Sequence, residues 1–332
     1  MTQRWGTLAW HGKRISARQL VFWTGAGFWV LLLLWSTGPA GIRALRNELV
    51  FLAGLIVLSS ATRSVNIREV ASLFFLGGFT MGLAYLLSPV LPSYPLRDFV
   101  APPIEEFLKI APVLYVLWRW RTTRTWTLGV TDVLLMAAAS GAGFSLVEDA
   151  FIRGSPGVSW LPTTVLHGNN LDAGHAIWTA VAGATIGFAL FFREKKVPAL
   201  ALGASGFVVA VFDHIQHNYG VDSHGTFERS MQFVAGNGWA FIDVFVVLVV
   251  AAVLFDLYVT LGTLPRVPEL KLPPFGGNLE NLKAQWAFLV GRRALAYLLF
   301  RYRRASGPAR AKLARLAAML DQSLVYHRSR AG

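Results

Sequence analysis

The sequence predicts an all-α membrane protein that crosses the bilayer about eight times, with both termini in the cytoplasm. Of the 332 residues, 54% are hydrophobic and only 15% are charged, a balance unusual for a soluble protein. The hydrophobic residues are concentrated in runs close to the length of a membrane-spanning helix. The basic residues lie mostly in alternate segments between these runs, which is typical of a multi-pass protein.

Each apolar run is near the roughly 20 residues that a helix needs to cross a bilayer. The second run is the shortest. The first is interpreted as a retained span, because no small-residue cleavage site follows it. The expected spans are residues 19–36, 48–62, 69–90, 101–118, 127–151, 174–192, 197–217 and 235–262.

The basic residues predict the orientation. With eight spans both termini share a side, and 25 of the 31 Lys and Arg residues fall on it, against 5 on the opposite side. Cytoplasmic loops carry such an excess, so the termini are expected in the cytoplasm of a cell-membrane protein. Contact with anionic lipid explains the net charge of +13, and no nucleic-acid partner is expected.

Two basic segments flank the expected membrane domain, residues 19–262. Residues 1–18 form an amphipathic lead-in, and residues 263–332 form a cytoplasmic tail that begins with a proline- and glycine-rich linker. An apolar stretch interrupted by two arginines is expected to lie on the membrane surface, where the tail contacts lipid. The last helix is expected to begin near Pro308 and to carry one apolar face, formed by Leu313, Leu316, Leu320 and Leu324.

The fourth expected span begins with three charges. Glu105 and Glu106 precede Lys109 by four and three residues, so all three lie on one helix face. Ionised groups at bilayer depth cost about a few kcal/mol and normally face protein or a wet cavity. A carboxylate with its own counter-ion can act as a general base. The alternative is a salt bridge at a helix end, at the level of the lipid headgroups.

Three more expected spans place polar residues at a similar depth, in the outer leaflet. Residues that merely meet the interface would be spread over both leaflets, so one shared site is favoured. The fifth span ends with two carboxylates, the sixth begins with a histidine, and the seventh ends with a polar cluster. These residues are Glu148, Asp149, His175, Asp213, His214, His217 and Asn218.

Two imidazoles and a carboxylate are a common catalytic zinc set that leaves a fourth position for water. The sequence contains no cysteine, so histidine and carboxylate are the ligands that remain. We expect Glu148, His175 and His214 to bind Zn²⁺. Asn218, four residues after His214, is expected to donate a hydrogen bond to an oxyanion.

Glu105 or Glu106 is expected to act as general base, with Lys109 holding one of them ionised and oriented. Several alternatives stay open. His217, Asp149 or Asp213 is a rival ligand, and a glutamate–histidine pair can act without metal. No local HExxH motif is present, so metal binding depends on convergence between helices.

The ordered motifs resemble the PrsW family of intramembrane metalloproteases. They are Glu105-Glu106-xx-Lys109, Gly143-Phe144-xxx-Glu148-Asp149, His175-Ala-Ile-Trp-Thr and His214-xxx-Asn218, and they cover about residues 100–218. That family shares a glutamate-rich membrane fold with CAAX prenyl endopeptidases and bacterial Abi-type proteins. The sequence departs from the family pattern in Asp149, where related sequences often have Asn, and in its long basic tail.

The resemblance implies proteolysis between helices, with the tandem glutamates and the histidines essential. It further implies a single-pass membrane protein as substrate, as in the first cut of a membrane-anchored anti-sigma factor on its extracytoplasmic side. The alternatives are a proton- or cation-coupled transporter, or a binding scaffold on a protease-like fold. A transport route would continue through Asp132 and Asp256 towards the cytoplasm.

Overall fold

The computed structural model describes residues 38–93, 96–121, 123–151, 165–167, 170–222, 239–263 and 279–331, with five residues between 23 and 31. Within these residues the chain is helical apart from one short hairpin, as the sequence predicts. The N-terminal segment 1–18 and most of the expected first span lie outside the described residues. The hairpin pairs β1 (Val165–His167) with β2 (Asn170–Asp172).

The helices follow the expected spans closely from the third onwards. The expected second and third spans correspond to α2 (Pro39–Leu58) and α3 (Ile67–Leu87). The fourth and fifth correspond to α4 (Arg97–Arg119) and α5 (Val130–Phe151). The last three are α6 (Gly174–Phe191), α7 (Lys196–Asp222) and α9 (Trp239–Thr263).

Five of these helices are long and apolar enough to cross a membrane: α3, α5, α6, α7 and α9. Helices α2 and α4 each contain three or more charged residues and are not among these five, so the count of eight spans stays a prediction. In α4 the helix begins at Arg97, and Pro102 and Pro103 therefore lie inside it rather than in its first turn.

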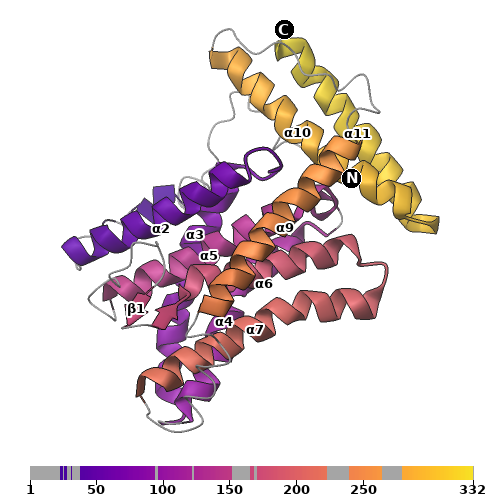
Figure 1. Cartoon of the computed structure of the whole chain (residues 1–332). Helices are drawn as coiled ribbons and strands as arrows, with labels where there is room; N and C mark the ends of the chain where they lie inside the picture. Colours follow the sequence, from indigo (N-terminus) through magenta and orange to yellow (C-terminus); the bar gives the residue numbers. More distant parts are fainter. Residues whose placement is uncertain are drawn as a thin grey trace.

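Helix α5 is at the centre of the bundle (Figure 1). In an apolar 18-residue segment of α5, 94% of the segment is buried inside the protein. The corresponding share is 28% in α7 and 28% in α9. Helix α5 packs against α3, α6 and α2. The outer helices expose large apolar side chains, among them Leu86, Val208, Val247 and Leu254, and such a surface suits contact with lipid.

Small residues allow α3 and α5 to approach closely. A Cβ at Gly77 of α3 would overlap the backbone carbonyl of Ser140, and one at Gly143 of α5 would overlap that of Phe74. Close backbone approach through small residues is a common way to pack membrane helices. Gly82, although part of the same glycine-rich stretch, has open space around it.

Gly77→Ala should therefore lower the free energy of unfolding by about 1–3 kcal/mol, because the added methyl overpacks the α3–α5 interface. Thermal melting in detergent measures this. Gly82→Ala, in the same helix, is the control and should be neutral or slightly stabilising. Equal melting temperatures for the two variants would contradict the close packing described here.

Two buried aspartates fix the N-terminus of α5. Asp132 accepts hydrogen bonds from the backbone N–H of Ser64 (2.7 Å), Val65 (2.9 Å) and Gly129 (2.8 Å). Asp256 of α9 accepts from the N–H of Val130 (3.0 Å) and Thr131 (2.8 Å). The first N–H groups of a helix need such acceptors. Both carboxylates therefore hold the helix in place, which is a structural task.

The tail forms a helical pair, α10 (Leu279–Arg304) and α11 (Gly307–Ala331). Figure 1 shows the pair at one end of the molecule, beyond the end of α9. The predicted apolar face of α11 is confirmed, because its four leucines are buried against α10.

Helix α10 also contacts the bundle. The hydroxyl of Tyr297 donates to Thr62 O at 2.8 Å, and Arg301 Nη2 donates to Leu128 O at 2.9 Å. Arg301 Nη1 also donates to Trp126 O, in the short helix η2 (Arg124–Thr127). The amphipathic pattern did not predict these contacts between α10 and the bundle.

Candidate metal centre

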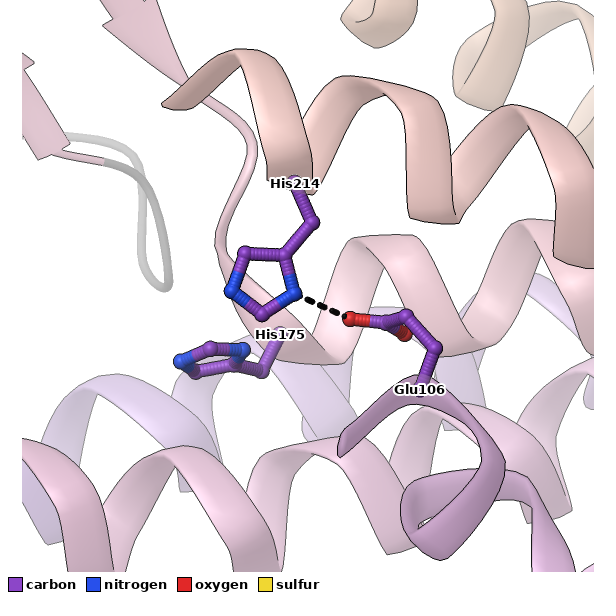
Figure 2. Close-up of side chains that lie close together, drawn as sticks. All are labelled: Glu106, His175 and His214. Atoms are coloured by element: carbon purple, nitrogen blue, oxygen red, sulfur yellow. Dashed lines mark hydrogen bonds and ion pairs between the residues drawn. The ribbon is translucent and has the colours of Figure 1, made fainter. Parts of the chain in front are cut away.

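Three helices bring a carboxylate and two imidazoles together inside the protein. Glu106 is in α4, His175 is in the first turn of α6, and His214 is in α7. Each of the three residues is 2% exposed. One potential ligand atom from each lies within 4.8 Å of the others. Figure 2 shows the three side chains converging from separate helices.

Glu106 is held from two sides. His214 Nδ1 donates a hydrogen bond to Glu106 Oε1 at 2.8 Å (Figure 2). Lys109 Nζ donates to the same oxygen at 2.6 Å and lies 2.5 Å from His175 Nδ1. The predicted contact between Lys109 and a glutamate of its own helix thus involves Glu106. Lys109 consequently links the carboxylate to the second histidine.

The buried ammonium group of Lys109 is also surrounded by aromatic faces. Its Nζ is 4.7 Å from the ring centroid of Phe144 and 5.3 Å from that of Trp178. Aromatic faces attract cations, particularly when the cation is desolvated. This surrounding and the pairing with Glu106 explain how Lys109 can be fully buried.

Trp178 orients the histidine of α7. Its indole stacks on the His214 ring with centroids 4.3 Å apart and an interplanar angle of 18°. Its Nε1 donates to Asp213 Oδ2 at 2.7 Å, which gives the buried Asp213 a partner. Sequence reasoning did not assign Trp178 a role. The available signal was its position three residues after His175, on the same face of α6.

Two further carboxylates meet the other edges of the imidazole rings. Glu148 Oε2 is in direct contact with His175 Nε2, and Glu105 Oε2 is 3.7 Å from His214 Nε2. The Glu148 and Glu105 side chains are 15% and 24% exposed, in contrast to the fully enclosed Glu106. The cluster is therefore most open on the side of these two carboxylates.

The remaining predicted residues lie around this cluster. Asn218 is half-buried in α7, one turn beyond His214. His217 is half-buried with its ring 5.9 Å from Trp178. Asp149 accepts a hydrogen bond from Ser145 at 3.2 Å. The roles expected from the sequence stay predictions for Glu105, Glu106, Lys109, Glu148, His175, His214 and Asn218.

Comparison with known families identifies the family of the chain. The model of the PrsW family intramembrane metalloprotease matches residues 49–256, which is more than half of the chain. The chain belongs to the PrsW family. It is thus a member of a membrane protease family, and the predicted resemblance is confirmed. No curated protein and no solved structure matches the chain.

The PrsW match includes all the residues of the cluster and ends before α10 and α11. A PrsW metalloprotease implies a metal, and the donor set fits one. Two imidazoles and a carboxylate are buried within 4.8 Å of each other, the composition of a common catalytic zinc site. The carboxylate of this set is Glu106, whereas Glu148 contacts one of the two histidines.

Proposed function

We propose that the protein is a zinc-dependent intramembrane endopeptidase, a hydrolase that cuts a single-pass membrane protein near the extracytoplasmic leaflet. The convergence of Glu106, His175 and His214 carries this proposal, in a chain that belongs to a metalloprotease family. Zinc in such a site supplies a Lewis acid and activates water for attack on a peptide carbonyl.

The protein's own residues have separate tasks in this proposal. Glu106, His175 and His214 hold the metal, and Glu148 is the alternative third ligand. Lys109 donates a hydrogen bond to Glu106 and fixes its position relative to His175, as the contacts of 2.6 Å and 2.5 Å support.

Glu105 is the general base. Its Oε2 lies 3.7 Å from His214 Nε2, and its partial exposure allows water to reach it. In this role the carboxylate accepts the proton of the attacking water and passes it to the leaving amine. Asn218 is the proposed donor to the oxyanion, because it follows His214 by one helical turn.

The charge distribution and the family support the proposed orientation and substrate. The excess of basic residues on one side supports cytoplasmic termini in a multi-pass plasma-membrane protein. Glu148 and His175 then lie at the extracytoplasmic ends of α5 and α6. Site-1 cleavage of a membrane-anchored anti-sigma factor is the specific reaction we propose.

Transport is less well supported than proteolysis. A proton route from the cluster would continue through Asp132 and Asp256 to the other end of the bundle. Both of these aspartates already accept several backbone and hydroxyl hydrogen bonds at the start of α5. Their presence therefore needs no transported ion.

Glu105→Gln tests the proposed mechanism. It should slow cleavage by about 10²–10⁴-fold, because the amide cannot accept the proton. The assay is co-expression with a single-pass anti-sigma factor that carries a different tag at each end, followed by detection of the fragments. Zinc content should stay at the wild-type level, since Glu105 is not a proposed ligand. Unchanged fragment production by Glu105→Gln would remove Glu105 as the base.

A further inference from the structure

A second group of polar side chains lies at the opposite end of the bundle, around Trp126 of η2. The guanidinium group of Arg193, just after α6, lies over the Trp126 indole. Lys312 of α11 approaches the same ring, with Nζ 5.7 Å from its centroid. Arg301 of α10 binds the backbone carbonyl of Trp126. Three cations from different parts of the chain therefore surround one tryptophan.

Several donors in this group have no acceptor within the described part of the chain. The Nε and Nη2 atoms of Arg193, Nε1 of Trp126 and Nε of Arg301 are buried, and none has a hydrogen-bond partner among the residues that the structure describes. Buried donors in folded proteins are almost always bonded, so four of them in one place indicate a missing acceptor. Since all four are donors, an anion with several oxygens is the kind of group that would satisfy them.

The charges in this group repel one another. Burial and the neighbouring charge of Arg301 lower the pKa of Arg193 to about 8, although Glu194 acts in the opposite direction. Burial and the charge of Arg193 also lower the pKa of Lys312. An anion placed between these cations would relieve the repulsion and supply the acceptor.

The location favours a phosphate group. Arg193 and Lys312 are half-buried, so the group can be reached from outside, whereas Arg301 is buried behind it. Guanidinium groups bind phosphate oxygens through directed hydrogen bonds. The group lies where α6 ends, and the distribution of basic residues predicts this end to meet the cytoplasmic leaflet.

We propose that Arg193, Lys312 and Trp126 form a binding site for a phosphate-bearing anion, provided by an anionic lipid headgroup or by a soluble phosphate. The bound anion joins the end of α6 and the tail helix α11 to η2. This site is independent of the proposed proteolytic reaction, because it lies at the far end of α5 and α6 from Glu148 and His175.

The test uses the purified full-length protein in a neutral detergent. Dioctanoyl phosphatidylglycerol, inorganic phosphate and dioctanoyl phosphatidylcholine are titrated separately, and binding is followed by melting temperature. We expect phosphatidylglycerol or inorganic phosphate to raise the melting temperature with saturation. A response to phosphatidylglycerol alone identifies the lipid as the source, and a response to inorganic phosphate identifies a soluble anion.

Arg193→Gln should weaken this binding at least tenfold. Lys312→Gln is a second variant, and it keeps the test valid if Arg193→Gln by itself lowers the melting temperature. Arg303→Gln removes the same charge from an exposed position of α10 and should bind as the wild type does. The proposal is wrong if neither anion binds, if phosphatidylcholine binds as well as phosphatidylglycerol, or if the Arg193 and Lys312 variants both keep wild-type affinity.

Discussion

Replacing His214 with alanine should reduce cleavage of a membrane substrate by roughly 10⁴-fold or more. His214 is buried, bonds to Glu106 and stacks on Trp178. Its removal therefore takes away one proposed metal ligand and also the hydrogen bond that holds the Glu106 carboxylate. Catalytic groups that act as a unit lose most of their effect when any one is removed. The rate is measured from the appearance of the released fragment in reconstituted vesicles.

His217→Ala is the matched control for this prediction. His217 is in the same helix, one turn later, half-buried and outside the convergent set. We expect its variant to cleave within a few-fold of the wild-type rate. If the His217 variant lost all activity while the His214 variant kept it, the ligand assignment in α7 would be wrong.

Asp132→Ala should have the largest effect on stability, with a loss of about 3 kcal/mol or more in the free energy of unfolding. The carboxylate is fully buried and accepts hydrogen bonds from three backbone N–H groups and from the Ser64 hydroxyl. Its removal leaves the three backbone N–H groups buried without an acceptor, at about 1–3 kcal/mol each, whereas the Ser64 hydroxyl keeps Thr127 O as an acceptor. The measurement is the midpoint of denaturation in mixed micelles.

Asp321→Ala provides the comparison for this effect. Asp321 is an exposed aspartate of α11, so its replacement should change the unfolding free energy by less than about 0.5 kcal/mol. A small and equal effect of both substitutions would show that Asp132 has no structural role. Asp132 would then be available again as part of a transport route.

The apolar runs predicted α5, α6, α7 and α9 to within a few residues, because hydrophobic length is the property that a bilayer selects. Helix α2 begins at Pro39, nine residues before the expected start. Its first turns contain Arg43, Arg46 and Glu48, which interrupt the apolar pattern. Glu48 is nonetheless 1% exposed, near Ser145 and Asp149 of α5. The burial of an ionisable side chain of this kind depends on neighbouring helices, which a linear pattern does not contain.

The sequence places the residues of the candidate site on four expected spans, but it does not determine their contacts. Helical spacing placed Glu106 and Lys109 together, and their hydrogen bond is present. The choice between Glu106 and Glu148 as the carboxylate nearest both histidines depends on how α4, α5 and α7 rotate. The stacking of Trp178 on His214 also depends on how the helices rotate. Rotation is set by packing such as that of Gly77 on Ser140, which involves residues distant in sequence.

The central claim is that Glu106, His175 and His214 hold one metal ion. Metal analysis of the purified protein tests it most directly, with His175→Ala, His214→Ala, Glu106→Gln and Glu148→Gln measured beside the wild type. We predict about one zinc per wild-type chain, loss of the metal from both histidine variants and from Glu106→Gln, and its retention in Glu148→Gln. Absence of metal from a folded wild type purified without chelator, or retention of zinc by Glu106→Gln with its loss from Glu148→Gln, would contradict that claim.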